Sequence, residues 1–187
     1  LMKEQTKPLS FNVTNLQGFP KEIDVDCRVY TEKKNEKNET ALGDCVLHEK
    51  VISNRSFVPE KLYGLPSGTY RMKLAVWDEK GRKNEQEVSF VLFSEKDKCI
   101  PCDESMWFYQ PQAEFDKDGM VTYYFGSKEK DVYLFYDEMW GNNEMKRKRI
   151  MFSDSILIFR YNYQEAYGDG LRGSFAYQQN GELCGQH

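Results

Sequence analysis

The strongest constraint on the fold is a stretch of alternating residues between positions 62 and 93. Apolar side chains occupy every second position in residues 70–76 and again in residues 88–92. Alternation with a period of two is typical of a β-strand that buries one face. Residues 78–81 (DEKG) separate the two runs and have the composition of a turn. The stretch therefore predicts a hairpin that closes a β-sandwich.

Shorter alternating runs precede this hairpin. Residues 8–15 and 23–29 each place apolar side chains at alternate positions, which predicts two further strands. Residues 31–40 are almost wholly polar and predict a long exposed loop, followed by short strands near 45–47 and 57–58. About six or seven short strands with frequent turns suit an immunoglobulin-like sandwich.

The alternation stops over residues 94–105 and starts again at Met106. Strand-like runs then recur, separated by turn residues, up to the end of the chain; they lie near residues 106–109, 121–125, 132–136, 145–152, 156–161 and 171–177. The run 132–136 is apolar on both sides, which predicts a central strand. The sequence thus predicts an all-β chain of two tandem immunoglobulin-like β-sandwiches, residues 1–95 and 96–187.

Charge and hydropathy exclude some classes of function. The formal net charge of −4 argues against a generic nucleic-acid-binding protein. No apolar run approaches the roughly 20 residues that cross a bilayer, so no direct membrane insertion is expected. The chain shows no signal peptide and opens on Leu1, so we expect it to be an excised part of a longer protein.

Several short motifs, taken in order, resemble one known family. Residues 15–20 (NLQGFP) resemble the N-x-x-G-x-P hairpin that opens macroglobulin-type domains, and residues 65–70 (LPSGTY) resemble their L-P-x-G-x-Y element. Together with residues 90–94, 125–127 and 165–170, they resemble the large alpha-2-macroglobulin-family proteins of Bacteroidetes. The resemblance extends over nearly the whole chain and rests on the order and spacing of the motifs.

The resemblance implies a setting rather than a reaction. Such proteins are secreted or surface-tethered protease traps, in which a bait segment is cut and the molecule closes around the protease. It implies neighbouring domains of the same full-length chain as partners, target proteases reached through that chain, and a periplasmic or cell-surface location. Many members carry a thioester at a Cys-Gly-Glu-Gln motif. Cys184-Gly185-Gln186 lacks the Glu, so no thioester and no bait segment are assigned here.

The chain contains five cysteines, an odd and sparse set that does not indicate a disulfide scaffold. Cys99-x-x-Cys102 is the sharpest local signal, but a redox pair normally opens a helix in a βαβ unit, and a zinc site needs two more ligands. A linker pair, either bridged or as two free thiols, is favoured. Cys27 and Cys45 form either a disulfide bridge or two buried free thiols.

Two charged motifs each have a structural and a functional interpretation. Residues 116–119 (DKDG) are similar to the start of a calcium loop, but Ser127 stands where the loop's bidentate Glu is required, so a β-turn is favoured. Residues 146–149 (KRKR) fit a solvated edge strand protected by charge. A polyanion-binding patch is the alternative.

The remaining signals are weaker. An aromatic set comprises Trp107, Phe108, Tyr109 and Trp140, and forms either a carbohydrate platform or part of a core or seam. Asn12, Asn38 and Asn54 begin Asn-x-Ser/Thr sequons, which arise easily by chance. With only two histidines in the chain, a Ser-His-Asp or Cys-His centre is not expected.

No residue is therefore assigned as catalytic, cofactor-binding or metal-binding, and no cofactor is expected. We expect a non-catalytic scaffold segment of an alpha-2-macroglobulin-like protease-trapping inhibitor. A surface adhesion or glycan-binding module of tandem sandwiches is the alternative from a second class. The accessory β-domain pair of a secreted hydrolase is a third.

Overall fold

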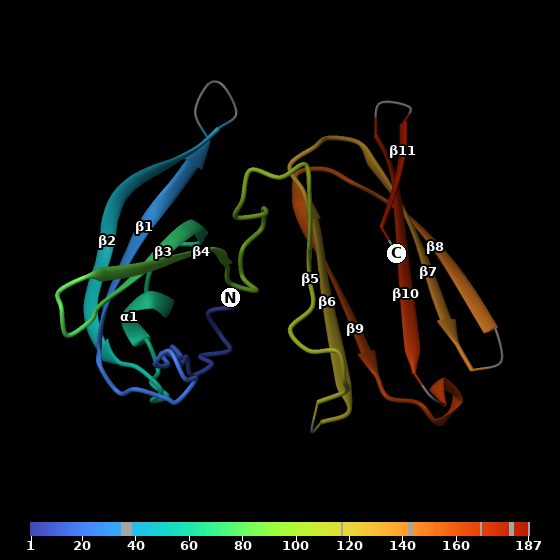
Figure 1. Cartoon of the computed structure of the whole chain (residues 1–187). Helices are drawn as coiled ribbons and strands as arrows, with labels where there is room; N and C mark the ends of the chain where they lie inside the picture. The colour runs from blue at the N-terminus through green and yellow to red at the C-terminus, as the bar shows by residue number, and fades with distance from the viewer. Residues whose placement is uncertain (35–38, 117, 142–143, 169, 180–181, 187) are drawn as a thin grey trace. The chain divides into compact units, whose positions relative to one another are not determined.

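The computed structural model describes residues 1–34, 39–116, 118–141, 144–168, 170–179 and 182–186. The described chain is nearly all β and forms three antiparallel sheets (Figure 1). The prediction of an all-β chain with immunoglobulin-like sandwich architecture is confirmed. The chain divides into two compact units, residues 1–97 and 98–187, called the first and second unit below. The sequence places this division between residues 95 and 96.

The first unit contains one four-stranded sheet in the order β2-β1-β3-β4. Its strands are β1 (Asp24–Lys34), β2 (Thr40–Ile52), β3 (Gly68–Trp77) and β4 (Lys83–Leu92). β3 and β4 form the expected hairpin, with Tyr70 opposite Phe90 and Met72 opposite Val88. Because the pleat alternates, the apolar positions of both strands lie on one face of the sheet.

That face is covered by a helix and by extended chain rather than by a second regular sheet. The short helix α1 (Glu60–Tyr63) contributes Leu62 and Tyr63, and it lies on the same side of the sheet as the N-terminal segment (Figure 1). The buried members of this core are Cys27, Val29, Leu62, Tyr63, Tyr70, Met72 and Leu92.

Two predictions from the sequence are wrong in the first unit. Residues 8–15 form no continuous strand; they are extended and make isolated bridges, Leu9 with Phe57 and Thr14 with Pro20. The expected loop at 31–40 is partly strand, and residues 40–52 form one 13-residue strand instead of a short one. β2 is mostly exposed, and Gly43 and Asp44 interrupt its apolar positions, so its side chains give little signal for one long strand. Its pairing with β1 holds it instead.

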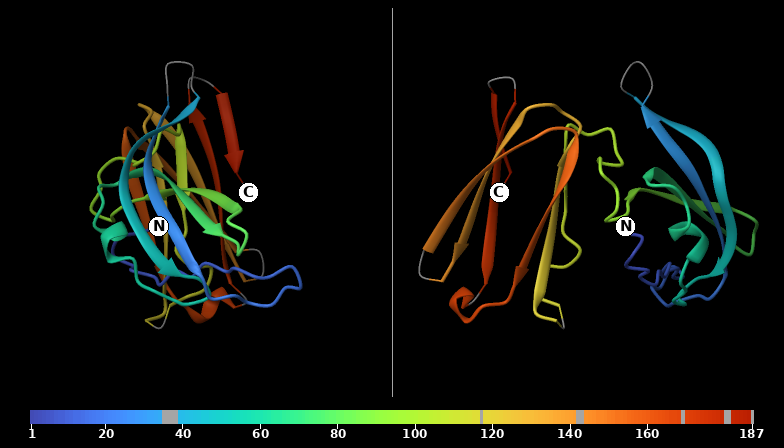
Figure 2. Two further views of the ribbon diagram at one scale, coloured as in Figure 1. Left: turned by 60° about the vertical axis from the view of Figure 1, so that its left-hand side comes forward. Right: turned by 180° about the vertical axis from the view of Figure 1, so that it is seen from behind.

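The second unit is a two-sheet sandwich. Its four-stranded sheet has the order β11-β10-β7-β8 and its three-stranded sheet the order β5-β6-β9 (Figure 2). The strands are β5 (Met106–Tyr109), β6 (Met120–Ser127), β7 (Val132–Trp140), β8 (Glu144–Phe152), β9 (Ser155–Asn162), β10 (Leu171–Gln179) and β11 (Glu182–Gln186). A 3-10 turn, η1 (Glu165–Tyr167), precedes β10.

Aromatic rings fill the space between these two sheets. The ring of Phe175 lies 4.6 Å from that of Tyr136 and 5.1 Å from that of Phe125, centroid to centroid. Phe159 packs on Tyr136 at 4.9 Å. β7 lies between two other strands as predicted, but only one of its faces is buried, because Tyr133 on the opposite face is 51% exposed.

Three turns share one side-chain-stabilised design. Asn15, Asp78 and Asp116 each begin a four-residue turn that ends in glycine. In each, the side-chain Oδ1 accepts the N–H groups two and four residues later, at 2.8 to 3.0 Å. The glycines have φ of 85°, 76° and 71°, a region that favours residues without a Cβ. The Asx-x-x-Gly pattern therefore fixes these three chain reversals locally.

Candidate functional site

The four cysteines whose side chains are described are free thiols. Cys27 is buried on the inner face of β1 and lies opposite Glu49, whereas Cys45 is exposed on β2 and lies opposite Tyr30. The two thiols are therefore not bridged, and the alternative of two buried thiols is wrong for Cys45, which is exposed. Burial, together with the negative charges of Glu49 and Asp26, raises the pKa of Cys27 to about 11. A thiol with such a pKa is a poor nucleophile at neutral pH.

Hydrogen bonds hold the chain around Cys99–Cys102 against residues 154–156 of the second unit. Cys99 donates a hydrogen bond from its thiol to the carbonyl of Asp154 at 3.3 Å, and Lys98 accepts one from the Ile156 N–H at 3.1 Å. Cys102 is buried. The segment leads into strand β5, which supplies no helix N-terminus to lower a thiol pKa. Cys99 and Cys102 are therefore two free thiols rather than a disulfide-bridged pair.

Asp116 performs a structural task in its turn. Its Oδ1 accepts the N–H groups of Asp118 at 2.9 Å and of Met120 at 2.8 Å. The β-turn interpretation is thus confirmed by the geometry around this carboxylate. Within the described residues, no three or more His, Cys, Asp or Glu side chains gather where they could hold a metal ion.

The basic cluster lies on β8, at an edge of the four-stranded sheet, as the edge-strand interpretation expects. Arg147 forms a bidentate ion pair with Asp137 on the neighbouring strand β7, with Nε to Oδ1 and Nη2 to Oδ2 both at 2.7 Å. The guanidinium holds the pKa of Asp137 below its usual range. Arg149 lies over the ring of Phe135 at 5.9 Å. Two of the four cations are therefore engaged on the outward face of the sheet.

The inward side of β8 contributes to a buried polar cluster that the sequence did not single out. Lys148 Nζ and the hydroxyl of Tyr161 both donate to Oε1 of Glu138, which is 5% exposed. Burial and the hydrogen bond to Glu138 raise the pKa of Tyr161. The signal was present in the sequence, because Glu138 continues the inward series of β7 begun by Val132. The cluster links β7, β8 and β9 within the sandwich.

The four candidate platform aromatics do not gather on one surface. Trp107 and Tyr109 stack at 6.1 Å on one side of β5, while Phe108 on the other side packs on Tyr123 and Phe175. Trp140 belongs to the other sheet and contacts Tyr167 at 6.1 Å. The set is thus divided among separate parts of the second unit.

The outer face of the first sheet carries charged groups. His48 Nε2 lies 2.7 Å from Oδ2 of Asp26, and Arg28 donates to Oδ1 of the same carboxylate at 2.8 Å. These hydrogen bonds, that of His48 foremost, lower the pKa of Asp26. A shallow pocket of about 250 Å³ lies beside them, between Tyr30 and Trp77.

The inner face of the same sheet borders a larger groove of about 520 Å³. Residues 10–14 form one wall, and residues 84–86 of β4 form the other. Half-buried Leu74 and Val76 form its floor, with the fully buried Val25 beneath. No pattern in the sequence indicated this groove, because its two walls are at least 70 residues apart in the chain.

The sequons have different environments. Asn54 has a φ of 58° and donates through its amide to the carbonyls of Val13 and Lys21, both at 2.8 Å. This side chain is therefore used to hold the N-terminal segment. Asn12 is exposed on the wall of the groove, and Asn38 lies outside the described residues.

Comparison with known proteins gives little support for an assignment. No family model and no curated protein matches this sequence. Among solved structures, a tetra-tandem repeat in the extending region of a large adhesion protein is similar with a TM-score of 0.29 and 7% sequence identity. The alignment covers 87% of this chain and 40% of that one. At this TM-score the similarity carries no inference. No helix in the described part of the chain is long and apolar enough to span a bilayer.

Proposed function

We propose that this chain is a non-catalytic scaffold segment whose two β units hold neighbouring domains of a longer exported protein in place. The observation that carries the proposal is the use of the charged side chains. Those that would be candidates for chemistry are engaged in cross-strand pairs and turns, as Asp116, Asp137 and Glu138 show. Such pairs fix strand register and leave broad sheet faces for contact with other domains.

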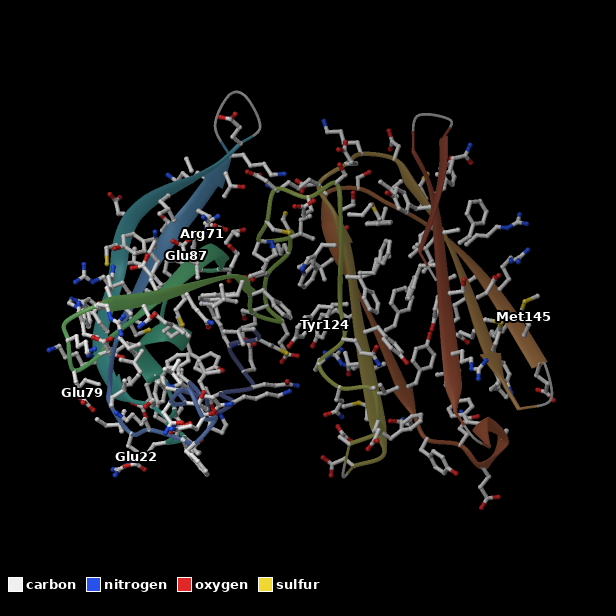
Figure 3. All side chains as sticks on the ribbon, viewed as in Figure 1. Glu22, Arg71, Glu79, Glu87, Tyr124 and Met145 are labelled. Carbon is white, nitrogen blue, oxygen red and sulfur yellow. The ribbon has the colours of Figure 1, made fainter. Side chains whose placement is uncertain are left out.

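The outer face of the first sheet illustrates this use of charge. Arg71 on β3 bonds Glu32 on β1 at 2.5 Å and Glu87 on β4 at 3.4 Å, and Lys73 bonds Glu87 at 2.6 Å. Figure 3 shows Arg71 and Glu87 together on this face. The network joins three adjacent strands, so it restrains their relative movement more than isolated surface pairs do.

The biological setting is taken from the resemblance to alpha-2-macroglobulin-family proteins. In that setting the partners are the flanking domains of the same chain, and target proteases are met through the full-length protein. The location is the periplasm or the cell surface of a bacterium. Bait cleavage and trapping belong to other parts of the molecule, and this segment contributes rigid spacing.

The test uses the chain itself with a panel of proteases and a protein-sized substrate. The expected result is unchanged protease activity at equimolar and tenfold molar excess of the chain, and no hydrolysis of ester, peptide or glycoside substrates. The full-length protein serves as the positive control for trapping. Stoichiometric inhibition by the chain alone contradicts the proposal. Specific retention on a glycan array assigns the chain instead to the adhesion or glycan-binding class.

A further inference from the structure

The inner face of the first unit's sheet is covered at one end and open at the other. Tyr70 and Met72 of β3 are 3% and 5% exposed beneath α1 and the N-terminal segment. Leu74 and Val76, further along the same face of β3, are only half-buried. The uncovered end is the floor of the 520 Å³ groove.

The second unit shows what a complete second layer looks like in this chain. There a regular three-stranded sheet lies over a four-stranded sheet, and the facing aromatic side chains are buried. In the first unit the opposing layer consists of α1 and the extended residues 8–14, with isolated bridges in place of a ladder. Over the β3–β4 half of its sheet, the first unit therefore lacks a regular strand in the opposing layer.

The wall formed by residues 10–14 has backbone groups available for pairing. On one side, Leu9 exchanges both hydrogen bonds with Phe57, and Phe11 accepts from the Asn54 N–H at 2.8 Å. Ser10 and Asn12 point the other way, as alternation in extended chain requires. Their backbone groups and side chains have no hydrogen-bond partner among the described residues.

The opposite wall also has a free edge. β4 pairs with β3 and is the last strand of its sheet, so every second N–H and C=O of residues 84–86 faces away from the ladder. Unpaired backbone groups therefore occur in both walls, but those of β4 point along the plane of the sheet, away from β3 and from the groove floor. An unpaired edge of this kind is a template for an additional strand.

The charge of the groove limits what fits there. Of the eleven lining residues only Glu85 is charged, and its carboxylate is paired with Nζ of Lys83. The floor is aliphatic, and the rim carries the neutral amides of Asn12, Asn84 and Gln86. Burying an unpaired charge against this lining is unfavourable, whereas an uncharged chain meets apolar contacts below and amide partners at the rim.

We infer that this groove binds an extended, uncharged polypeptide segment of a partner, which adds a strand to residues 10–14 and completes the sandwich. Its alternate apolar side chains rest on Leu74 and Val76, and its backbone bonds to Ser10 and Asn12. About five residues of partner strand match the length of the wall. The inference goes beyond the scaffold function, because it does not depend on whether the parent protein traps proteases.

The probe is the peptide Gly-Ser-Thr-Val-Thr-Val-Thr-Ser-Gly, titrated into the isotopically labelled 187-residue chain and followed by the chemical shifts of backbone amides. Saturable shifts are expected at residues 10–14 and 84–86, and the N–H groups of Ser10 and Asn12 should exchange with solvent at least about tenfold more slowly. The same peptide with both valines N-methylated loses backbone donors and is expected to bind at least about tenfold more weakly.

A matched pair of variants separates groove binding from general effects. Val76→Lys places a charge on the floor and should weaken peptide binding at least about tenfold. Val46→Lys makes the same change on β2, outside the groove and at a position 39% exposed, and should leave binding unchanged. If Val76→Lys unfolds the chain, Gln86→Lys on the exposed rim replaces it.

Three outcomes of the peptide titrations would overturn the inference. These are no saturable shift at millimolar peptide, equal binding by both lysine variants, and equal binding of the N-methylated peptide. Maltotriose is titrated in parallel as a neutral oligosaccharide. Saturable maltotriose shifts at residues 10–14 and 84–86, in the absence of peptide shifts there, assign the groove to sugars and also overturn it.

Discussion

The side chain of Ile100 packs directly against the α-carbon of Gly126. A methyl group at Gly126 would overlap the Cγ2 of Ile100 and would lie 3.2 Å from the carbonyl oxygen of Ser155. Ile100 is 4% exposed, so it has little free space into which to move. Ile100, one of the two residues between Cys99 and Cys102, therefore packs this segment against β6, and the contact requires a glycine.

Replacing Gly126 by alanine should destabilise the second unit. Gly126→Ala is expected to lower the free energy of unfolding by about 1–3 kcal/mol, as overpacked sites typically do, measured by urea denaturation. In the double variant with Ile100→Ala, the two costs should not add, because the smaller side chain removes the overlap. If Gly126→Ala is as stable as the parent protein, the segment that contains Ile100 moves away without cost and the prediction is wrong.

The turn at Asp116 should depend on one oxygen atom rather than on negative charge. Asp116→Ala removes the acceptor of two backbone N–H groups and should cost about 1–2 kcal/mol of stability. Asp116→Asn retains Oδ1 and should cost much less, since Asn15 forms the same turn in the first unit. The comparison uses urea unfolding and the solvent exchange of the Met120 amide. Equal costs for the two variants would contradict this role.

The thiols should differ in reactivity according to exposure. Cys45 and Cys99 are exposed and should be alkylated by iodoacetamide in the native protein, whereas Cys27 and Cys102 are buried and should react only after unfolding. Peptide mass mapping after timed alkylation distinguishes the four sites. A disulfide between any two of them in non-reduced protein would disagree with the structure.

Stability should fall in alkaline solution. Burial raises the pKa of Tyr136 to about 12 from its ordinary value of 10.0, and it raises that of Tyr161 as well. The folded state therefore keeps protons that the unfolded state releases near pH 10, so this contribution is complete below pH 10 and is lost as the pH rises toward 12.

For Tyr136 the expected slope is at most about 1.4 kcal/mol per pH unit. Unfolding free energies between pH 8 and 12 measure it, and Tyr136→Phe should flatten the decline above pH 10. An identical decline in that variant would assign the effect to other groups.

Local sequence determined most of the strands and their reversals. The period-two runs at residues 70–76 and 88–92 became β3 and β4, because alternation alone sorts side chains onto two faces. The Asx-x-x-Gly turns at Asn15, Asp78 and Asp116 were equally readable, since each is closed by a side chain within four residues. The edge position of residues 146–149 followed from their charge.

Tertiary structure alone decided features that depend on residues far apart in the chain. Residues 8–15 alternate like a strand but form only isolated bridges, whereas the mostly exposed β2 becomes a long strand because β1 pairs with it. Burial of Glu138 requires Lys148 and Tyr161 from two other strands. The groove exists because residues 10–14 lie opposite β4 without completing a layer above it. Periodicity reports which face a side chain takes, but only packing decides what covers that face.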